Sequence, residues 1–454
     1  MATIIKGGQV VLESGVQTLD IAVEGEHILA LGENLPVKDG DAVIDAAGRI
    51  VLPGVIDSHV HFNMQTASGG RNADDFVTGS ACAAVSGVTT VVDFAGPQEN
   101  RTLPEALLSR AEEAKGNCYT DYSFHMEITN ECPIDFKEIA LLPAAGIRAL
   151  KIYTTYGKTE LPAERLPALF EAAAEADMIT LVHAEDNDII LATRELFKAT
   201  GRTQAKFHGE SRPIAAEASA IRKILPLAQK AGAQIIIAHI SSGEGANLVA
   251  KARAAGQKVY GETCPHYLLL TDECYQMEDP QRFIMTPPLR RSADNEQLWA
   301  SVVSGDIDKI STDHCPFKLS DKIAVDSCFE AIPGIGGTET LLPLMFYEGY
   351  LKGRLSLLEL SKRLSLAAAK LYGLYPQKGV IAVGSDADLV IVDPNEEYAI
   401  TADRYPSRAG YTVYEGRRVK GLPKLTMLRG EIIARDGKIV AGCKQGRFVK
   451  ASQK

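Results

Sequence analysis

Histidine, lysine and aspartate side chains stand at or near the ends of several apolar segments of this 454-residue chain. The first two are His59 and His61 in GVIDSHVH, where positions i and i+2 of a strand face the same side. Two imidazoles on one side can hold a metal ion, although this spacing alone is a weak signal. Four further candidates follow singly, each at the end of its own segment: Lys151 in RALKIYT, His183 in TLVHAE, His239 in IIIAHIS and Asp313 in ISTDHCP.

Any one of these histidines alone is as well explained as a hydrogen-bonded core residue, but their recurrence at the same position of several segments favours a metal site. Lys151 is the unusual member, because an ammonium group is costly to bury and repels a divalent cation. Addition of CO2 to its amine would give a carbamate, which removes the positive charge and offers two oxygens to two metal ions. Burial lowers the pKa of a lysine and favours this addition.

Two divalent ions in such a site would lower the pKa of a bridging water and produce hydroxide near neutral pH. Hydroxide attacks a carbonyl carbon, and nearby donors stabilise the resulting oxyanion. A carboxylate such as Asp313 can both bind metal and move protons, so we expect it to carry the proton from the water to the leaving nitrogen. The chemistry predicted from the residues is therefore metal-assisted hydrolysis.

The segments that must position these residues lie between 53 and 375, where short apolar runs alternate with Ala-, Glu- and Leu-rich helical stretches. Eight such runs are expected for an α/β fold of the TIM type, a (β/α)8 barrel. A doubly wound sheet has the same alternation. The polar residues at the strand ends favour the barrel, because all carboxyl ends of its strands open into one mouth.

The two chain ends, 1–52 and 376–454, are predicted to form short strands separated by turns rich in Gly, Asn and Asp. We expect them to build one small β-sandwich domain beside the barrel, since chain termini often lie close together.

Composition excludes several functional classes. The chain is 46% hydrophobic and 23% charged, which is typical of a globular protein, and its net charge of −10 predicts no nucleic acid and no anionic membrane as partners. None of its eight cysteines forms a CxxC pair, and no apolar run reaches the ~20 residues of a spanning helix. The N-terminal segment also lacks the apolar core of a signal peptide, so a cytoplasmic protein with free thiols is expected.

The set HxH, Lys, His, His, Asp resembles that of the amidohydrolase superfamily. More closely, the chain resembles the cyclic amidohydrolases of the dihydropyrimidinase/hydantoinase branch, which includes phenylhydantoinases, over essentially its whole length. The resemblance implies a distorted barrel, a binuclear zinc centre with an N6-carboxylated Lys151, and a homotetramer or homodimer. It also implies opening of a small cyclic amide or ureide to an N-carbamoyl amino acid. The matching segments are DDF (74–76), VVDFAGPQ (91–98), DYSFH (121–125), TDHCPF (312–317) and KGVIAVGSDADLVIVDP (378–394).

The same resemblance implies residues that contact the substrate. Tyr156 stands five residues after the lysine in KIYTTY, where the branch has a tyrosine that donates to the oxyanion. Thr286 in MTPPLR replaces a serine, and Pro333 in IPGIGGTE replaces an asparagine, in two segments that bind the ring largely through main-chain groups. Proline keeps its carbonyl acceptor. Phe62 and Asn63, next to the HxH pair, are expected to flank the substrate.

Three other functions remain open at this point. HVHFN (59–63) and ETCPHYLLL (262–270) resemble allantoinases or some phenylhydantoinases, which keeps allantoinase open. Dihydroorotase is less favoured, because the arginine of its HxHxR motif is replaced here by Asn63. Non-catalytic relatives of this fold have lost their metal ligands, whereas all six ligand positions are filled in this chain.

Overall fold

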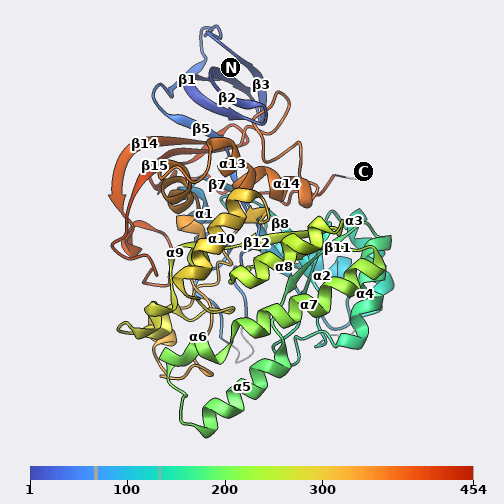
Figure 1. Cartoon of the computed structure of the whole chain (residues 1–454). Coiled ribbons are helices and arrows are strands. Elements are labelled where there is room, and N and C mark those ends of the chain that lie inside the picture. Colours follow the sequence, from blue (N-terminus) through green and yellow to red (C-terminus); the bar gives the residue numbers. More distant parts are fainter. Residues whose placement is uncertain (66–69, 132–133, 453–454) are drawn as a thin grey trace.

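The computed structural model describes the chain except for residues 66–69, 132–133 and 453–454. Two sheets organise the described residues (Figure 1): an eight-stranded parallel sheet from the middle of the sequence, and a nine-stranded sheet from the two chain ends. The predicted fold class, a barrel of the TIM type with a small β domain, is confirmed by this arrangement.

One strand of the parallel sheet lies at each of the eight apolar runs predicted between residues 53 and 375, and the strands neighbour one another in sequence order. They are β6 (Val55–Asp57), β7 (Val88–Ala95), β8 (Asp121–Glu127), β9 (Ala149–Tyr153), β10 (Ile179–His183), β11 (Gln234–Ile237), β12 (Val259–Thr263) and β13 (Lys309–Ile310). The first and last strands meet just beyond their carboxyl ends, where the main-chain N–H of His61 donates to the carbonyl of His314 at 2.8 Å. This contact brings residues 59–61 beside residues 311–314.

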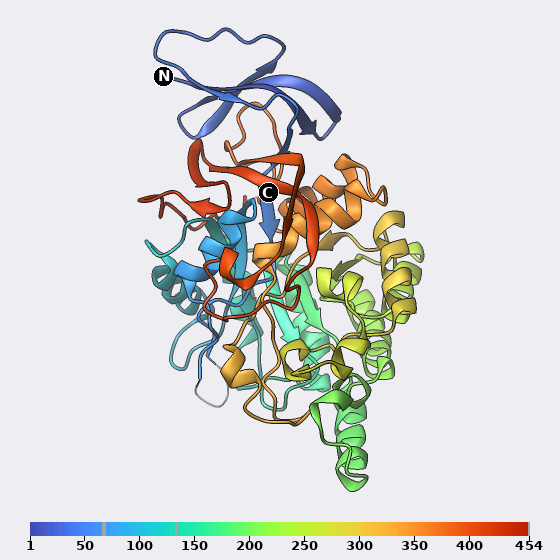
Figure 2. The same ribbon diagram turned by 90° about the vertical axis from the view of Figure 1, so that its left-hand side faces the viewer.

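Helices follow the strands and cover the outside of the sheet (Figures 1 and 2). Local sequence explains their limits: Thr102 and Glu105 form a capping box at the start of α2, and Gly232, at φ 67°, ends α7. The helices are α1 (Phe76–Val85), α2 (Leu103–Ala114), α3 (Leu142–Ala145), α4 (Leu166–Glu175), α5 (Asn187–Ala199), α6 (His208–Ser211), α7 (Ile214–Ala231), α8 (Gly243–Ala254), α9 (Pro265–Leu269), α10 (Ser292–Ser304), α11 (Leu319–Lys322), α12 (Leu341–Met345), α13 (Leu357–Ser361) and α14 (Ala367–Leu371).

Strand alternation divides the core into an interior and a helix-facing layer. On β9, Leu150 and Ile152 belong to the large cluster that packs under the helices, while Ala149 packs with inward residues of neighbouring strands such as Leu181. Because side chains at i and i+2 share a face, Lys151 points into the barrel with Ala149. The strand pairing sets Lys151 opposite Leu181.

The chain ends form one hydrogen-bonded sheet in the order β17-β16-β15-β14-β5-β1-β2-β3, with β4 beside β1. Its strands are β1 (Thr3–Leu12), β2 (Gly15–Glu24), β3 (His27–Gly32), β4 (Ala42–Asp45), β5 (Ile50–Pro53), β14 (Leu389–Ala399), β15 (Arg418–Leu428), β16 (Glu431–Arg435) and β17 (Lys438–Ile439). Figure 2 shows the blue N-terminal strands above the red C-terminal strands. Division of the chain into units 1–52 plus 376–454 and 53–375 stays a prediction.

A buried lysine joins this sheet to the barrel. The ammonium of Lys378 lies 2.5, 2.9 and 2.7 Å from carboxylate oxygens of Asp121, Asp386 and Asp388. Asp121 begins β8, whereas the other two precede β14. Three carboxylates with such spacing could hold a metal ion, but the lysine already supplies their positive charge. Among the described residues, no helix is both long and apolar enough to cross a membrane.

Candidate metal centre

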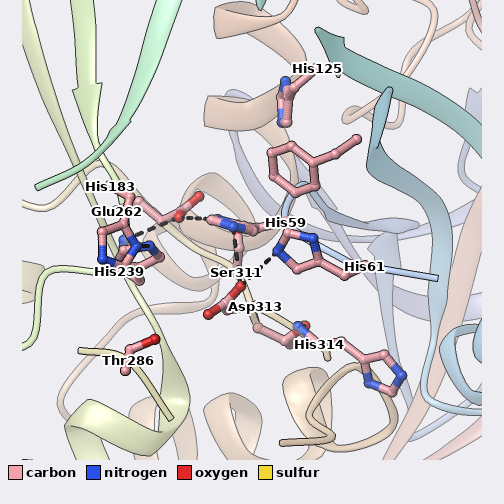
Figure 3. A network of polar contacts seen from close by, with 12 residues as sticks. His59, His61, His125, His183, His239, Glu262, Thr286, Ser311, Asp313 and His314 are labelled. Atoms are coloured by element: carbon pink, nitrogen blue, oxygen red, sulfur yellow. Dashed lines mark hydrogen bonds and ion pairs between the residues drawn. The ribbon is translucent and has the colours of Figure 1, made fainter. Parts of the chain in front are cut away.

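Closure of the barrel assembles a first group of candidate ligands, His59, His61 and Asp313 (Figure 3). The Nε2 atoms of His59 and His61 lie 3.2 and 3.1 Å from the same Oδ1 of Asp313. Asp313 adopts a left-handed backbone conformation, with φ 52°, that is uncommon outside glycine. The arrangement aims two imidazoles and one carboxylate at one point.

A second group of candidate ligands comes from two other strands of the barrel: His183 ends β10, and His239 lies just after β11. Nδ1 of His183 lies 3.0 Å from Nε2 of His239, and Figure 3 shows the two rings side by side, across from His61. His239 also has a positive φ, 35°. Strained backbone at candidate ligands on two different strand ends is typical of functional sites.

Lys151 lies among these groups, and its charge acts on His59, His183, His239 and Asp313. The side chain is 1% exposed, and within the described part of the chain its ammonium has no hydrogen bond or ion pair. Its Nζ atom lies 5.3 and 5.0 Å from the centres of the rings of Phe94 and Tyr153. Burial lowers the pKa of Lys151 to about 8.

These residues fit divalent metal ions. Burial, and then the charge of Lys151, lowers the pKa of His59 to about 4, so its imidazole is neutral and offers a lone pair. His59 Nε2 is buried without a hydrogen-bonding partner, although the Asp313 carboxylate lies beside it. Burial raises the pKa of Asp313, but its contacts with His59 and His61 and the charge of Lys151 outweigh burial and hold that pKa well below its usual range. Neutral imidazoles beside an ionised carboxylate form the donor set that zinc prefers.

Buried carboxylates behind the histidines were missed by the sequence reasoning. Nδ1 of His59 lies 2.7 Å from Oε1 of Glu262, whose other oxygen contacts the ammonium of Lys309. Glu185 stands in the same relation to His183. Their sequence signal was their position, since Glu262 closes the run KVYGET and Glu185 follows His183 by two residues. Such carboxylates orient the ring and fix its tautomer.

Tyr156 and Thr286, predicted to contact substrate, lie together on the His183 side. The Tyr156 hydroxyl is 2.5 Å from Oγ1 of Thr286 and 3.2 Å from Nε2 of His183. Tyr156 has φ 78°, and burial raises the pKa of its phenol, so it stays protonated at neutral pH. The hydroxyl is therefore a hydrogen-bond donor at the edge of the candidate metal site.

The segment that carries Pro333 is held next to the Thr286 segment by Lys322, another residue that sequence reasoning missed. The buried ammonium of Lys322 donates to three main-chain carbonyls, those of Ile284, Ile332 and Gly334, at 2.9, 2.9 and 2.8 Å. Pro333 itself is exposed.

The structure does not bring Phe62 to the candidate ligands. Its ring is completely buried and meets those of Phe76 and His314 at centroid distances of 6.0 and 5.6 Å. The reason is alternation, because Phe62 faces the helix layer with Val60 when His59 and His61 face inward. Asn63 is half-buried and donates from its side-chain amide to Glu113.

The chain is similar to known proteins in both sequence and fold. The chain matches the amidohydrolase family over residues 50–433. It is 36% identical over 455 residues to a D-phenylhydantoinase of Escherichia coli O1:K1 / APEC, covering 99% of this chain and 98% of that protein. The crystal structure of dihydropyrimidinase from Brevibacillus agri NCHU1002 superposes with TM-score 0.95 at 33% identity, covering 100% and 99% of the two chains. An L-hydantoinase (dihydropyrimidinase) from Arthrobacter aurescens gives 0.90 at 31% identity, covering 99% of both.

Proposed function

Because the chain belongs to the amidohydrolase family, we propose that it hydrolyses the cyclic amide bond of 5-substituted hydantoins or dihydropyrimidines and releases N-carbamoyl amino acids. Similarity to a D-phenylhydantoinase and a dihydropyrimidinase over almost the whole chain supports this substrate class. The single observation that carries the proposal is the buried Lys151, which has no hydrogen-bonding partner among the described residues and lies among imidazoles and a carboxylate.

We propose that two divalent ions, zinc in the native enzyme, are held by both groups of side chains together with Lys151. The closeness of His59, His61 and Asp313 supports one position, and the facing nitrogens of His183 and His239 support the other. When bound, the two ions would supply Lewis acidity and lower the pKa of a water molecule.

Lys151 would join the site as its N6-carbamate. The neutral amine adds to CO2, a C–N bond forms, one proton leaves to solvent, and the product carries one negative charge. The lowered pKa of Lys151, about 8, supports this reaction, because more of the amine is neutral at pH 7 than for an ordinary lysine. The carbamate also replaces an unpartnered buried cation by a group with two acceptor oxygens.

The chain's own residues would carry the remaining steps. Asp313 accepts the proton of the attacking water and delivers it to the ring nitrogen as the C–N bond breaks. The hydroxyl of Tyr156 donates to the oxygen of the former carbonyl, where negative charge develops. Main-chain groups at Thr286 and Pro333 would hold the amide edge of the ring, and Lys322 keeps these two segments together.

The test is a panel of dihydrouracil, hydantoin, 5-substituted hydantoins and allantoin, with chiral analysis of the products. We expect turnover of hydantoins or dihydrouracil and little turnover of allantoin. Preference for allantoin would replace the proposal by an allantoinase, and no turnover by metal-loaded protein would favour a non-catalytic relative. Chiral analysis is needed because both D- and L-hydantoinases are among the similar proteins.

We also propose a homotetramer in the cytoplasm. The family resemblance supports the assembly, and light scattering coupled to size-exclusion chromatography tests it. Seven described cysteines are free thiols, which supports a reducing compartment.

A further inference from the structure

We propose that Glu185, held by Arg212, is a positioning residue that fixes the tautomer of His183 and thereby keeps the hydroxyl proton of Tyr156 available for the substrate. The inference rests on the proposed function, because it takes His183 as a metal ligand and Tyr156 as the oxyanion donor. It assigns a role to Glu185 and Arg212, which belong neither to the proposed metal ligands nor to the proposed substrate contacts.

Glu185 is completely buried behind His183, and its carboxylate is fully engaged. Oε2 lies 2.8 Å from Nε2 of His183. The guanidinium of Arg212, which follows α6, donates from Nε to Oε1 at 3.0 Å and from Nη2 to Oε2 at 2.5 Å. The hydroxyl of Thr154 donates to the Glu185 carbonyl at 2.8 Å and fixes the main chain. Arg212 therefore orients the carboxylate, and Thr154 holds the main chain that carries it.

The paired carboxylate decides which ring nitrogen of His183 carries the proton. A carboxylate that receives hydrogen bonds on both oxygens from a guanidinium is ionised and can only accept from His183. Nε2 must then carry the proton, and the neutral ring keeps its lone pair on Nδ1. Nδ1 is the atom that faces Nε2 of His239 at 3.0 Å, inside the candidate site. Only an unprotonated nitrogen binds a metal ion, so Glu185 selects the binding tautomer.

The same choice acts on Tyr156. Its hydroxyl oxygen lies 3.2 Å from Nε2 of His183 and would donate to that nitrogen if it carried a lone pair. With a proton on Nε2, the phenol cannot donate there, and its own proton is directed toward Thr286 or a bound substrate. The guanidinium carbon of Arg212 lies 5.5 Å from the centre of the Tyr156 ring and restrains it. One carboxylate therefore prepares both the ligand and the oxyanion donor.

Glu185→Gln and Glu185→Ala separate this role from simple packing. Glutamine has the shape of glutamate, but Arg212 would claim its carbonyl oxygen and leave its amide to donate to Nε2 of His183. The proton of the ring would then move to Nδ1 and block the metal position. Alanine has no amide that donates to Nε2 of His183, so the ring can carry its proton on either nitrogen. We therefore expect the isosteric glutamine variant to bind the second metal ion less tightly than the alanine variant, whereas a packing role predicts the reverse order.

A charge-balanced double variant provides the rescue. In Glu185→Gln with Arg212→Met, the amide can turn so that its oxygen accepts from Nε2 of His183, which restores the original tautomer. We expect chelator competition with Zn2+ to show about 10- to 100-fold weaker binding of one ion in the single glutamine variant. Most of that loss should be recovered in the double variant. The matched control is Glu210→Gln. Glu210 is an exposed glutamate on the neighbouring α6 and pairs with Arg202.

Nitrogen-15 NMR of the His183 ring in metal-free protein, with assignment from His183→Asn, gives a readout independent of metal and activity. We expect the proton on Nε2 in the wild type and on Nδ1 in Glu185→Gln. An unchanged tautomer, or tighter metal binding by the glutamine than by the alanine variant, would overturn the inference. If Glu185→Gln does not fold, the double variant must still bind the second ion more tightly than Glu185→Ala. A wild type that binds no metal and has no turnover would contradict the proposed function alone, because the nitrogen-15 NMR of His183 still tests the role of Glu185.

Discussion

Replacing Lys151 by methionine should stabilise the metal-free protein while abolishing activity of the metal-loaded enzyme. Burial lowers the pKa of this ammonium from 10.5 to about 8. Because one pH unit corresponds to about 1.4 kcal/mol, keeping the charge in the folded state at pH 7 destabilises the protein by roughly 3 kcal/mol. Methionine has a similar length and no charge, so the metal-free variant should gain most of that amount.

The pH dependence of folding stability tests independently whether the Lys151 charge destabilises the protein. Below pH 8 the lysine is protonated in both the folded and the unfolded state, and the full destabilisation is present. Between about pH 8 and 10.5 only the unfolded state holds the proton, so the stability of the wild type rises with pH. The difference in unfolding free energy between Lys151→Met and the wild type should therefore shrink across this range.

Lys309→Met is the matched control, because Lys309 is equally buried but contacts Glu262 and donates to Ser58 at 2.9 Å. Its pairing raises the pKa of Lys309, and its removal leaves the Glu262 charge buried without that partner. We expect a loss of about 3–5 kcal/mol, opposite in sign to Lys151→Met.

The assay is urea unfolding in the presence of a chelator, followed by the fluorescence of the single tryptophan, Trp299, on α10. Metal content and ring opening are measured on the reconstituted proteins. A Lys151→Met protein that is less stable than the metal-free wild type would refute the electrostatic reasoning. One that keeps two metal ions and full turnover would refute the role of the carbamate.

Three further outcomes are expected. Tyr156→Phe should lower kcat by roughly 10²–10³ with little change in KM, and an unchanged kcat would remove the phenol from the mechanism. Chelation should abolish turnover and Zn2+ should restore it; turnover by protein that elemental analysis shows to be metal-free would contradict metal-assisted hydrolysis. Lys322→Met leaves three main-chain carbonyls around Thr286 and Pro333 without their donor and should raise KM by about tenfold, whereas exposed Lys318→Met should resemble the wild type. Equal KM values for Lys322→Met and the wild type would show that the hydrogen bonds of Lys322 do not shape the substrate site.

The sequence alone was sufficient to predict the barrel and the candidate ligands, because both produce short-range patterns in the sequence. An apolar run that ends in one polar residue is a local signal, and the eight runs recur at the spacing of a parallel barrel. Lys151 was recognisable for the same reason, since it interrupts the apolar residues Ala149, Leu150 and Ile152. Side-chain direction was less accessible: Phe62 was placed beside the substrate, whereas strand alternation turns it into the core.

What holds the candidate ligands in place was decided only by the tertiary structure. Glu185 meets Arg212, and Glu262 meets Lys309, across intervals of the chain in which no periodicity links the partners. Barrel closure likewise brings Asp313 to His59 across more than half of the sequence. A local pattern records which residue types end a strand. The orientation of each ring and the proton that it carries depend on charges supplied by distant segments, and these act only once the barrel has closed.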